Sequence, residues 1–284
     1  MNSPVSNPCL QMKTSNSLLL GLVLAACPFA ESLSQSAGDA QRVTVRSNML
    51  GIGGTRVLDT YLSQEHFSGF GLTFLSTSEY LRNNRCWSTL VEHEANISSV
   101  HDRADNREEL EGAYNLYLGR LRTWKLLDGR LALQAGGMAN VTLGVIYNTA
   151  NGNNPAQARF ALNIMPVGAA TYRFQLWNIS FTARCELAAH LAGIRFSPNY
   201  GQSYYEIFSC GNYDHNVVPT TTLSAPEWRT VLTLDARLSK RVTLRLGYLG
   251  NFQQADINSI KQHVYTHRAL IGITKSFSII PRQL

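Results

Sequence analysis

The chain has 284 residues, 44% of them hydrophobic, which is enough for one large all-β domain or two small ones. Its formal net charge is +6 and its mean hydropathy is −0.12. The basic residues are scattered singly along the chain, which argues against a nucleic-acid partner. After the N-terminus no apolar segment approaches the roughly 20 residues of a membrane-spanning helix, which excludes a helical membrane protein.

The N-terminal segment has the features of a secretory signal. The apolar run Leu18–Ala30 follows Lys13 and is too short to span a bilayer. Small residues after this run place a cleavage site before Gln35, so residues 1–34 are predicted to be a signal peptide. Met12 is the more natural start of such a signal, and we expect it to be the initiator.

A lipoprotein signal is the alternative interpretation of the same segment. Leu24–Cys27 fits a lipoprotein cleavage box, in which Cys27 would be acylated. We favour the ordinary signal, because such a tetrapeptide arises easily by chance inside an apolar run. Either signal exports the chain.

The remaining chemistry-bearing residues do not suggest a metal site. The sequence has no CxxC, HxH, HxxH or HExxH motif, so we predict no metal and no cofactor. Cys185 falls on the apolar face of a predicted strand, where a thiol behaves as a small hydrophobe. Cys86 and Cys210 would lie at opposite ends of the predicted fold, and we expect free thiols.

A polar lead is predicted over residues 35–50. Residues 51–284 then alternate apolar and polar side chains in about ten segments. Leu232 and Leu234, for example, share one face of a segment while Asp235 falls on the other. The predicted strands are Thr55–Leu62, Phe70–Leu81, Trp87–Val100, Leu110–Trp124, Leu131–Tyr147, Gln157–Leu176, Ile179–Phe196, Glu227–Leu238, Val242–Phe252 and Tyr265–Phe277.

The connections between these strands alternate in length. Those at 82–85, 126–129, 177–178 and 239–240 are short, whereas those at 148–155 and 197–225 are long and those at 101–106 and 257–262 intermediate. Bacterial outer-membrane barrels have short periplasmic turns, longer outer loops and an even number of strands. We therefore predict an antiparallel transmembrane β-barrel of about ten strands in the bacterial outer membrane, with eight or twelve strands as alternatives.

A soluble β-sandwich would also alternate. Several predicted strands, however, exceed the five or six residues that are usual in sandwiches. Aromatic residues also lie near strand ends, as the interfacial girdles of a barrel require: Tyr80, Trp87, Trp124, Tyr147, Trp177 and Trp228. Both features favour the barrel.

The faces opposite the apolar ones carry charged residues, which would point into the lumen. Acidic residues dominate the early strands and arginines the late ones. A buried charge is tolerated only when paired, so we predict Glu–Arg networks that plug the lumen. The predicted lumen charge network is Glu79, Glu92, Glu94, Glu111, Arg184, Glu186, His190, Arg229, Asp235, Arg237 and Arg245. The alternative is that these charges line a narrow channel or bind a polar solute.

Two His–Asp pairs are the weak candidates for catalysis. His101 is followed by Asp102, and His215 is preceded by Asp214, both in predicted outer loops. A His–acid pair could orient a general base. Neighbours on a strand point to opposite faces, however, and no motif selects a nucleophile. We favour ordinary polar loop residues and a protein that is not an enzyme.

The loop 197–225 is rich in aromatic residues. Aromatic side chains on an outer loop can contact a glycan or another envelope protein, or can fold back and cap the barrel. Its aromatic residues are Tyr200, Tyr204, Tyr205, Phe208 and Tyr213. The expected partners are thus outer-membrane lipid and an envelope protein or glycan at this loop.

The segment Gly51–Gly71, together with Ala170–Arg173 and Leu246–Tyr248, resembles an uncharacterised outer-membrane family with a domain of unknown function, common in the Bacteroidota. The resemblance covers most of the mature chain. It implies an outer-membrane β-barrel and supplies no catalytic residues. Three functions stay open: a structural or accessory barrel that docks partners through its outer loops, a narrow channel or solute-binding barrel, and a barrel hydrolase.

Overall fold

The computed structural model describes residues 42–82, 86–152, 154–239 and 242–279. The predicted signal peptide, Met12 and Cys27 lie outside these residues. Among the described residues no helix is long and apolar enough to cross a membrane.

The described chain forms twelve β-strands and one short α-helix. The strands are β1 (Arg42–Asp59), β2 (Ser63–Arg82), β3 (Trp87–His101), β4 (Glu108–Leu126), β5 (Leu131–Asn148), β6 (Ala156–Leu176), β7 (Ile179–Ala189), β8 (Ala192–Phe196), β9 (Val217–Thr221), β10 (Glu227–Arg237), β11 (Thr243–Ile257) and β12 (Ile260–Ile279). The helix α1 is Tyr204–Phe208, and a 3₁₀ turn spans Leu127–Gly129.

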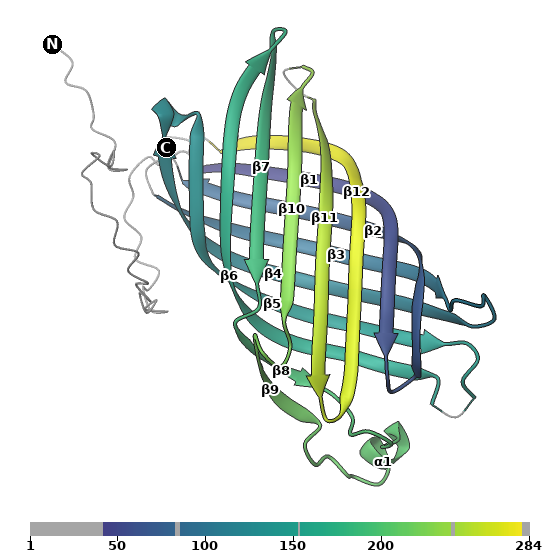
Figure 1. The fold of residues 1–284 in the computed structure, drawn as a ribbon. Coiled ribbons are helices and arrows are strands. Elements are labelled where there is room, and N and C mark those ends of the chain that lie inside the picture. The colour runs from purple at the N-terminus through teal and green to yellow at the C-terminus, as the bar shows by residue number, and fades with distance from the viewer. Residues whose placement is uncertain (1–41, 83–85, 153, 240–241, 280–284) are drawn as a thin grey trace, which may run out of the picture.

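The strands close into one antiparallel barrel (Figure 1). β1 pairs with β2 on one side and with β12 on the other, and β5 pairs with β6, so the sheet has no open edge at these strands. The short β8 continues the line of β7 along β6, and β9 pairs with β8. When β8 is counted with β7, and β9 with β10, the wall has ten strands. The predicted closed all-β barrel of ten strands is confirmed.

The first strand begins earlier than predicted. Arg42 to Leu50 belong to β1, where they pair with β2 and β12, so the prediction of a polar lead over 35–50 is wrong for these residues. Arg46 and Asn48 lie on the outward face, which hides the apolar alternation. The predicted loop 197–225 likewise contains α1 and β9.

The two ends of the barrel differ. Arg42 pairs with Ile279, so both ends of the described chain lie together, at the end that also holds the tight turn Trp177–Asn178. We call this the terminal end. The opposite end, here the loop end, carries the connections 102–107 and 149–155 and the longest loop, 197–216, with α1 (Figure 1).

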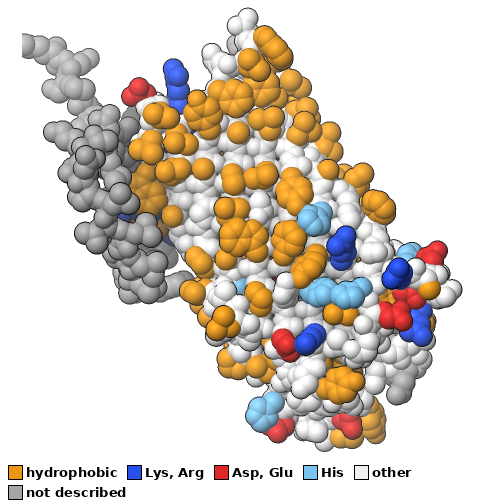
Figure 2. All heavy atoms as spheres, viewed as in Figure 1, with side chains coloured by type: hydrophobic (Ala, Val, Ile, Leu, Met, Phe, Trp, Pro, Cys, Tyr) orange, Lys and Arg blue, Asp and Glu red, His pale blue; other side chains and the backbone are white. Residues whose placement is uncertain are grey.

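The alternation of side chains gives the wall two different faces. Large apolar residues such as Ile52, Phe70 and Leu72 point outward, and Phe70 is 79% exposed. Figure 2 shows such hydrophobic side chains spread over the wall, with most of the charged ones gathered near the loop end. Polar and charged residues instead point inward and are buried. This pattern is the inverse of a soluble barrel.

Glycines in the middle of β1 allow neighbouring groups to approach closely. A Cβ added at Gly53 would lie 2.0 Å from the carbonyl oxygen of His267, and one added at Gly71, its partner on β2, would lie 2.5 Å from Nη2 of Arg268. The Gly-rich segment therefore leaves room for β12 and the buried arginine it carries.

We predict that Gly53→Ala destabilises the barrel by about 1–3 kcal/mol, because the new methyl group forces the backbones of β1 and β12 apart. Urea unfolding in detergent, followed by tryptophan fluorescence, measures the change. Gly54→Ala is the matched control, since its Cβ would meet no atom closer than 3.9 Å. Equal stability of both variants would contradict the close approach seen here.

Candidate functional site

Arg229 on β10 is the centre of the lumen. It is 1% exposed. Its Nε lies 3.0 Å from Oε2 of Glu94, and its Nη1 lies 2.8 Å from Oε2 of Glu92 and 3.4 Å from Oε1 of Glu186. The guanidinium carbon also sits 4.3 Å from the ring centre of Tyr117, a cation–π geometry. One cation is therefore enclosed by three carboxylates and an aromatic face. We call these residues the Arg229 cage.

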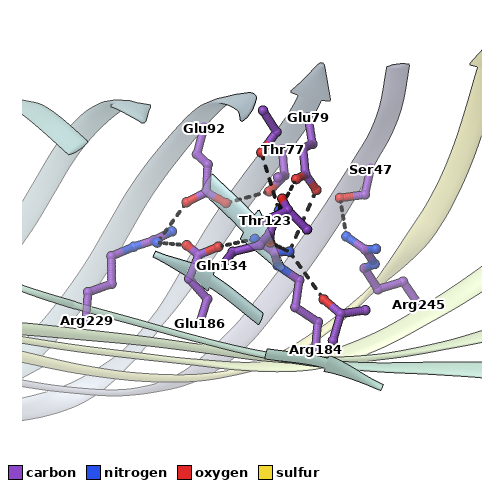
Figure 3. Close-up of polar contacts among 12 residues, drawn as sticks. Ser47, Thr77, Glu79, Glu92, Thr123, Gln134, Arg184, Glu186, Arg229 and Arg245 are labelled. Carbon is purple, nitrogen blue, oxygen red and sulfur yellow. Dashed lines mark hydrogen bonds and ion pairs between the residues drawn. The ribbon is translucent and has the colours of Figure 1, made fainter. Parts of the chain in front are cut away.

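The cage bridges opposite sides of the wall. Glu92 and Glu94 come from β3 and Tyr117 from β4, whereas Glu186 and Arg229 come from the neighbouring strands β7 and β10. Each lies on an inward-facing position of its strand. In Figure 3 Glu92 and Arg229 point toward each other across the interior. The cage thus ties two halves of the barrel that are far apart in sequence.

A second cluster adjoins the cage at Glu186. Nη2 of Arg184 lies 2.8 Å from Oε2 of Glu186, and its Nη1 lies 3.7 Å from Oε2 of Glu79. Gln134 links the same groups, since it donates to Glu79 at 2.7 Å and accepts from Arg184 at 2.5 Å (Figure 3). Six of the predicted network residues therefore share one continuous set of contacts: Glu79, Glu92, Glu94, Arg184, Glu186 and Arg229.

Arg245 and Asp235 form a separate pair toward the terminal end. Nε and Nη2 of Arg245 contact the two carboxylate oxygens of Asp235 at 2.5 and 2.6 Å, a bidentate geometry. Nη1 of Arg245 also donates to the hydroxyl of Ser47 on β1, over the intervening strand β12. Arg237, by contrast, is exposed at the end of β10 and makes no ion pair with the described residues.

Two buried arginines take part that the predicted network omits. Nη1 of Arg159 lies 2.7 Å from Oε1 of Glu111. Arg268 donates to the hydroxyls of Thr55, Thr73 and Ser98, at 2.7 to 3.0 Å, and has no carboxylate partner among the described residues. Both lie on the polar faces of their predicted strands, so the alternation that selected the other charges could have found them.

His190 lies where β7 passes into β8. It is 2% exposed, and its Nε2 is 3.4 Å from the hydroxyl of Thr220 on β9. No described carboxylate contacts it, so the structure places His190 in the interior but outside the Glu–Arg clusters.

The space between these side chains is small. Two interior cavities near Arg195 have volumes of about 20 and 10 Å³, room for a single water molecule at most. Closer to the loop end an apolar layer lies inside the wall, formed by Val57, Leu62, Phe67, Val100, Ile146 and Val264. Charged and apolar side chains therefore both project into the described interior.

The loop 197–216 covers part of the loop end. Tyr61, in the turn after β1, donates to the carbonyl of Gln202 at 3.0 Å. On the other side of the barrel, Tyr204 donates to Gln157 of β6 at 2.9 Å. Asn258, between β11 and β12, contacts the carbonyl of Ser197. The loop is thus anchored on three parts of the rim, as a cap.

The helix α1 stabilises the cap. Ser203 and Glu206 form a capping box, in which hydrogen bonds from the Ser203 backbone and hydroxyl hold the pKa of Glu206 below its usual value. Ile207 is fully buried beneath it, and Tyr204 stacks on Phe208 at 6.1 Å. Tyr200, Tyr205, Phe208 and Tyr213 remain exposed by 62% or more. The alternative of a loop that folds back to cap the barrel therefore describes its anchored residues, and contact of the exposed aromatic residues with a partner stays a prediction.

The weak catalytic candidates His101 and His215 both lie in the loop-end region. Nδ1 of His215 contacts Oδ1 of Asp214 at 2.7 Å, so the expectation that these neighbours point apart is wrong. The left-handed backbone at His215, with φ of 54°, brings them together. Both side chains are more than three-quarters exposed. Asp102, next to His101, instead accepts from the Asn106 backbone.

The described residues contain no group of three or more His, Cys, Asp or Glu placed to hold a metal ion. Cys86 is disulfide-bonded, which contradicts the expectation of free thiols. The expectation is based only on the distance between Cys86 and Cys210 in the predicted fold. Cys185 and Cys210 are free.

We predict that Arg229→Met lowers the free energy of unfolding by about 3–5 kcal/mol, because it leaves three buried carboxylates without their cation. Urea unfolding in detergent measures this loss. Replacing Glu92, Glu94 and Glu186 by Gln in the same variant should recover part of it.

Arg237→Met on the same strand is the control, and its effect should stay within about 0.5 kcal/mol. A similar loss in both variants, or no recovery by the Gln substitutions, would refute the role of the cage.

Comparison with known proteins adds a family and several similar folds. No curated protein matches the sequence. The Neisserial surface protein A structure is similar, with 9% identity and a TM-score of 0.36, over 83% of this chain and 97% of that one. The translocator domain of the autotransporter NalP from Neisseria meningitidis gives 10% identity and a TM-score of 0.38, over 85% and 90%.

The attachment invasion locus protein Ail of Yersinia pestis gives 11% identity and a TM-score of 0.26, over 84% of this chain and all of that one. The placement in the Bacteroidota, implied by the resemblance, stays a prediction. Residues 17–283 match the family described as "Protein of unknown function (DUF3316)", and the chain belongs to that family.

Proposed function

We propose that the protein is a bacterial outer-membrane β-barrel that does not conduct, and that it serves as a structural or accessory component. The outward apolar wall supports the membrane location, since a closed barrel leaves no backbone group unpaired in hydrocarbon. Aromatic side chains on the outward face near strand ends also support it: Tyr80, Trp87, Tyr147 and Trp228 are each 40–50% exposed. In this orientation the terminal end faces the periplasm.

The Arg229 cage is the observation that carries the proposal. Its side chains meet across the interior, in a barrel whose ten strands enclose little more space than side chains can fill. An ion would have to displace a guanidinium from three carboxylates to pass. The apolar layer around Phe67 adds a second obstruction toward the loop end.

A filled lumen leaves the loops as the surface for specific contacts. The cap is held to the rim by backbone and side-chain hydrogen bonds, so its exposed aromatic residues Tyr205, Phe208 and Tyr213 stand on an ordered base. Rigid aromatic side chains are favoured at binding surfaces. Another envelope protein or a glycan is the partner that this surface supports.

We predict that the purified protein gives no stable unitary currents in planar lipid bilayers, because the cage and the apolar layer fill the lumen. Insertion is checked separately on vesicles of the same lipid, by resistance of the wall to added protease. Large, reproducible currents from inserted protein would contradict a plugged lumen and favour the narrow channel.

We also predict that Leu72→Arg, at mid-height on the outward face of β2, lowers stability in lipid vesicles by about 2–4 kcal/mol, because the charge must enter hydrocarbon. Gln64→Arg, on the same face near the loop end, is the control and should cost about 0–1 kcal/mol. Urea unfolding in vesicles compares the two. Equal costs would mean that this face does not meet lipid.

A further inference from the structure

Two arginines project from the outward face of β4 near the terminal end. Arg120 and Arg122 are both exposed and stand on the same face, two residues apart. The outward residues before them, from Leu110 through Tyr114 to Leu118, are apolar or aromatic and exposed by 38–49%. The arginines therefore interrupt the apolar face of this strand, which ends with Trp124 and Leu126.

Their height fits the boundary between hydrocarbon and headgroups. Arg122 lies four residues before Leu126, the last residue of β4. With a rise of about 3.3 Å per residue and a strand tilt of about 40°, this is roughly 10 Å below the strand end. A membrane embedding the apolar face of β4 would thus set its headgroups beside both guanidinium groups.

Both guanidinium groups are held against tryptophan rings. The Cζ of Arg120 lies 5.8 Å from the ring centre of Trp87, and that of Arg122 lies 5.5 Å from Trp124. A cation on an aromatic face keeps its N–H edge free for a further acceptor while the ring restricts its motion. The pairs therefore present two oriented donor groups side by side.

No protein anion neutralises this pair. Arg122 faces Trp87 on β3 and Ala135 on β5, and Arg120 faces Thr89 and Gly137. Within the described residues neither arginine makes an ion pair, and no Asp or Glu occupies an outward position on the terminal-end halves of β3, β4 and β5. Two like charges this close repel, and an anion bound between them would relieve that repulsion.

We propose that Arg120 and Arg122 bind the phosphate of one anionic phospholipid in the inner leaflet, with Trp87 and Trp124 positioning the two guanidinium groups. The small side chains Ala135 and Gly137 leave space on β5 for an acyl chain to lie beside the pair. This inference rests on the proposed membrane location, which sets the terminal end at the inner leaflet.

Native mass spectrometry of detergent-solubilised protein tests the site. Phosphatidylglycerol and phosphatidylcholine with identical acyl chains are added separately, and the retained lipid is counted. Wild-type protein should retain phosphatidylglycerol about tenfold more strongly than the double variant R120Q/R122Q, since each arginine near a headgroup adds to the attraction. Phosphatidylcholine retention should not change.

Two further variants make the result specific. R120K/R122K keeps both charges and should keep most of the preference for phosphatidylglycerol. Arg56→Gln removes an exposed outward arginine of β1 near the loop end and should have no effect. If R120Q/R122Q does not fold, the single variants R120Q and R122Q take its place, each with an intermediate loss.

Equal retention by wild type and R120Q/R122Q overturns the inference, as does an equal loss in Arg56→Gln. Displacement of the lipid by inorganic phosphate at matched ionic strength would instead indicate a site for free anions. Insertion is measured independently, by quenching of tryptophan fluorescence with brominated lipid. Failure to insert rejects the proposed function, whereas insertion without lipid preference rejects only this site.

Discussion

The interior of this barrel is governed by the cost of a charge that bulk water cannot reach. A closed wall of backbone hydrogen bonds fixes every second side chain inside, so an ionised group there needs a partner from another strand. Arg229 meets this requirement with Glu92, Glu94 and Glu186, while Arg245 uses Asp235. Glu92 and Glu94 stand across the interior from Arg229, whereas Asp235 pairs with Arg245 on the adjacent strand, so the charges are satisfied both across the lumen and along the wall.

The same alternation gives the inner and outer faces of the wall different chemistry. Inside, most of the buried arginines are paired with carboxylates of the same interior. Outside, the wall presents large apolar side chains such as Ile52, Phe70 and Leu72, together with cations such as Arg120 and Arg122 nearer its ends. The partner and lipid contacts that we propose would accordingly lie near the two ends, at the cap formed by 197–216 and at Arg120 and Arg122.

Strand number and closure follow from period-two patterning and turn chemistry, and both are readable from the sequence. The start of β1 is not, because Arg46 and Asn48 break the apolar face while the backbone still pairs with Lys275 and Ile273. Residue type and face likewise indicate which charges point inward. Partner choice depends on the stagger between strands, which no local pattern encodes, and Arg268 pairs with hydroxyl groups that composition does not single out.

Arg268 has a consequence for how the molecule assembles. It lies on the last strand, yet the hydroxyl groups on β1, β2 and β3 to which it donates lie 170 to 213 residues earlier in the chain. Until the first and last strands meet, this guanidinium has none of them. An unclosed sheet would leave it without these acceptors, so partly closed intermediates lack this stabilisation and the final seam between β1 and β12 favours an all-or-none closure.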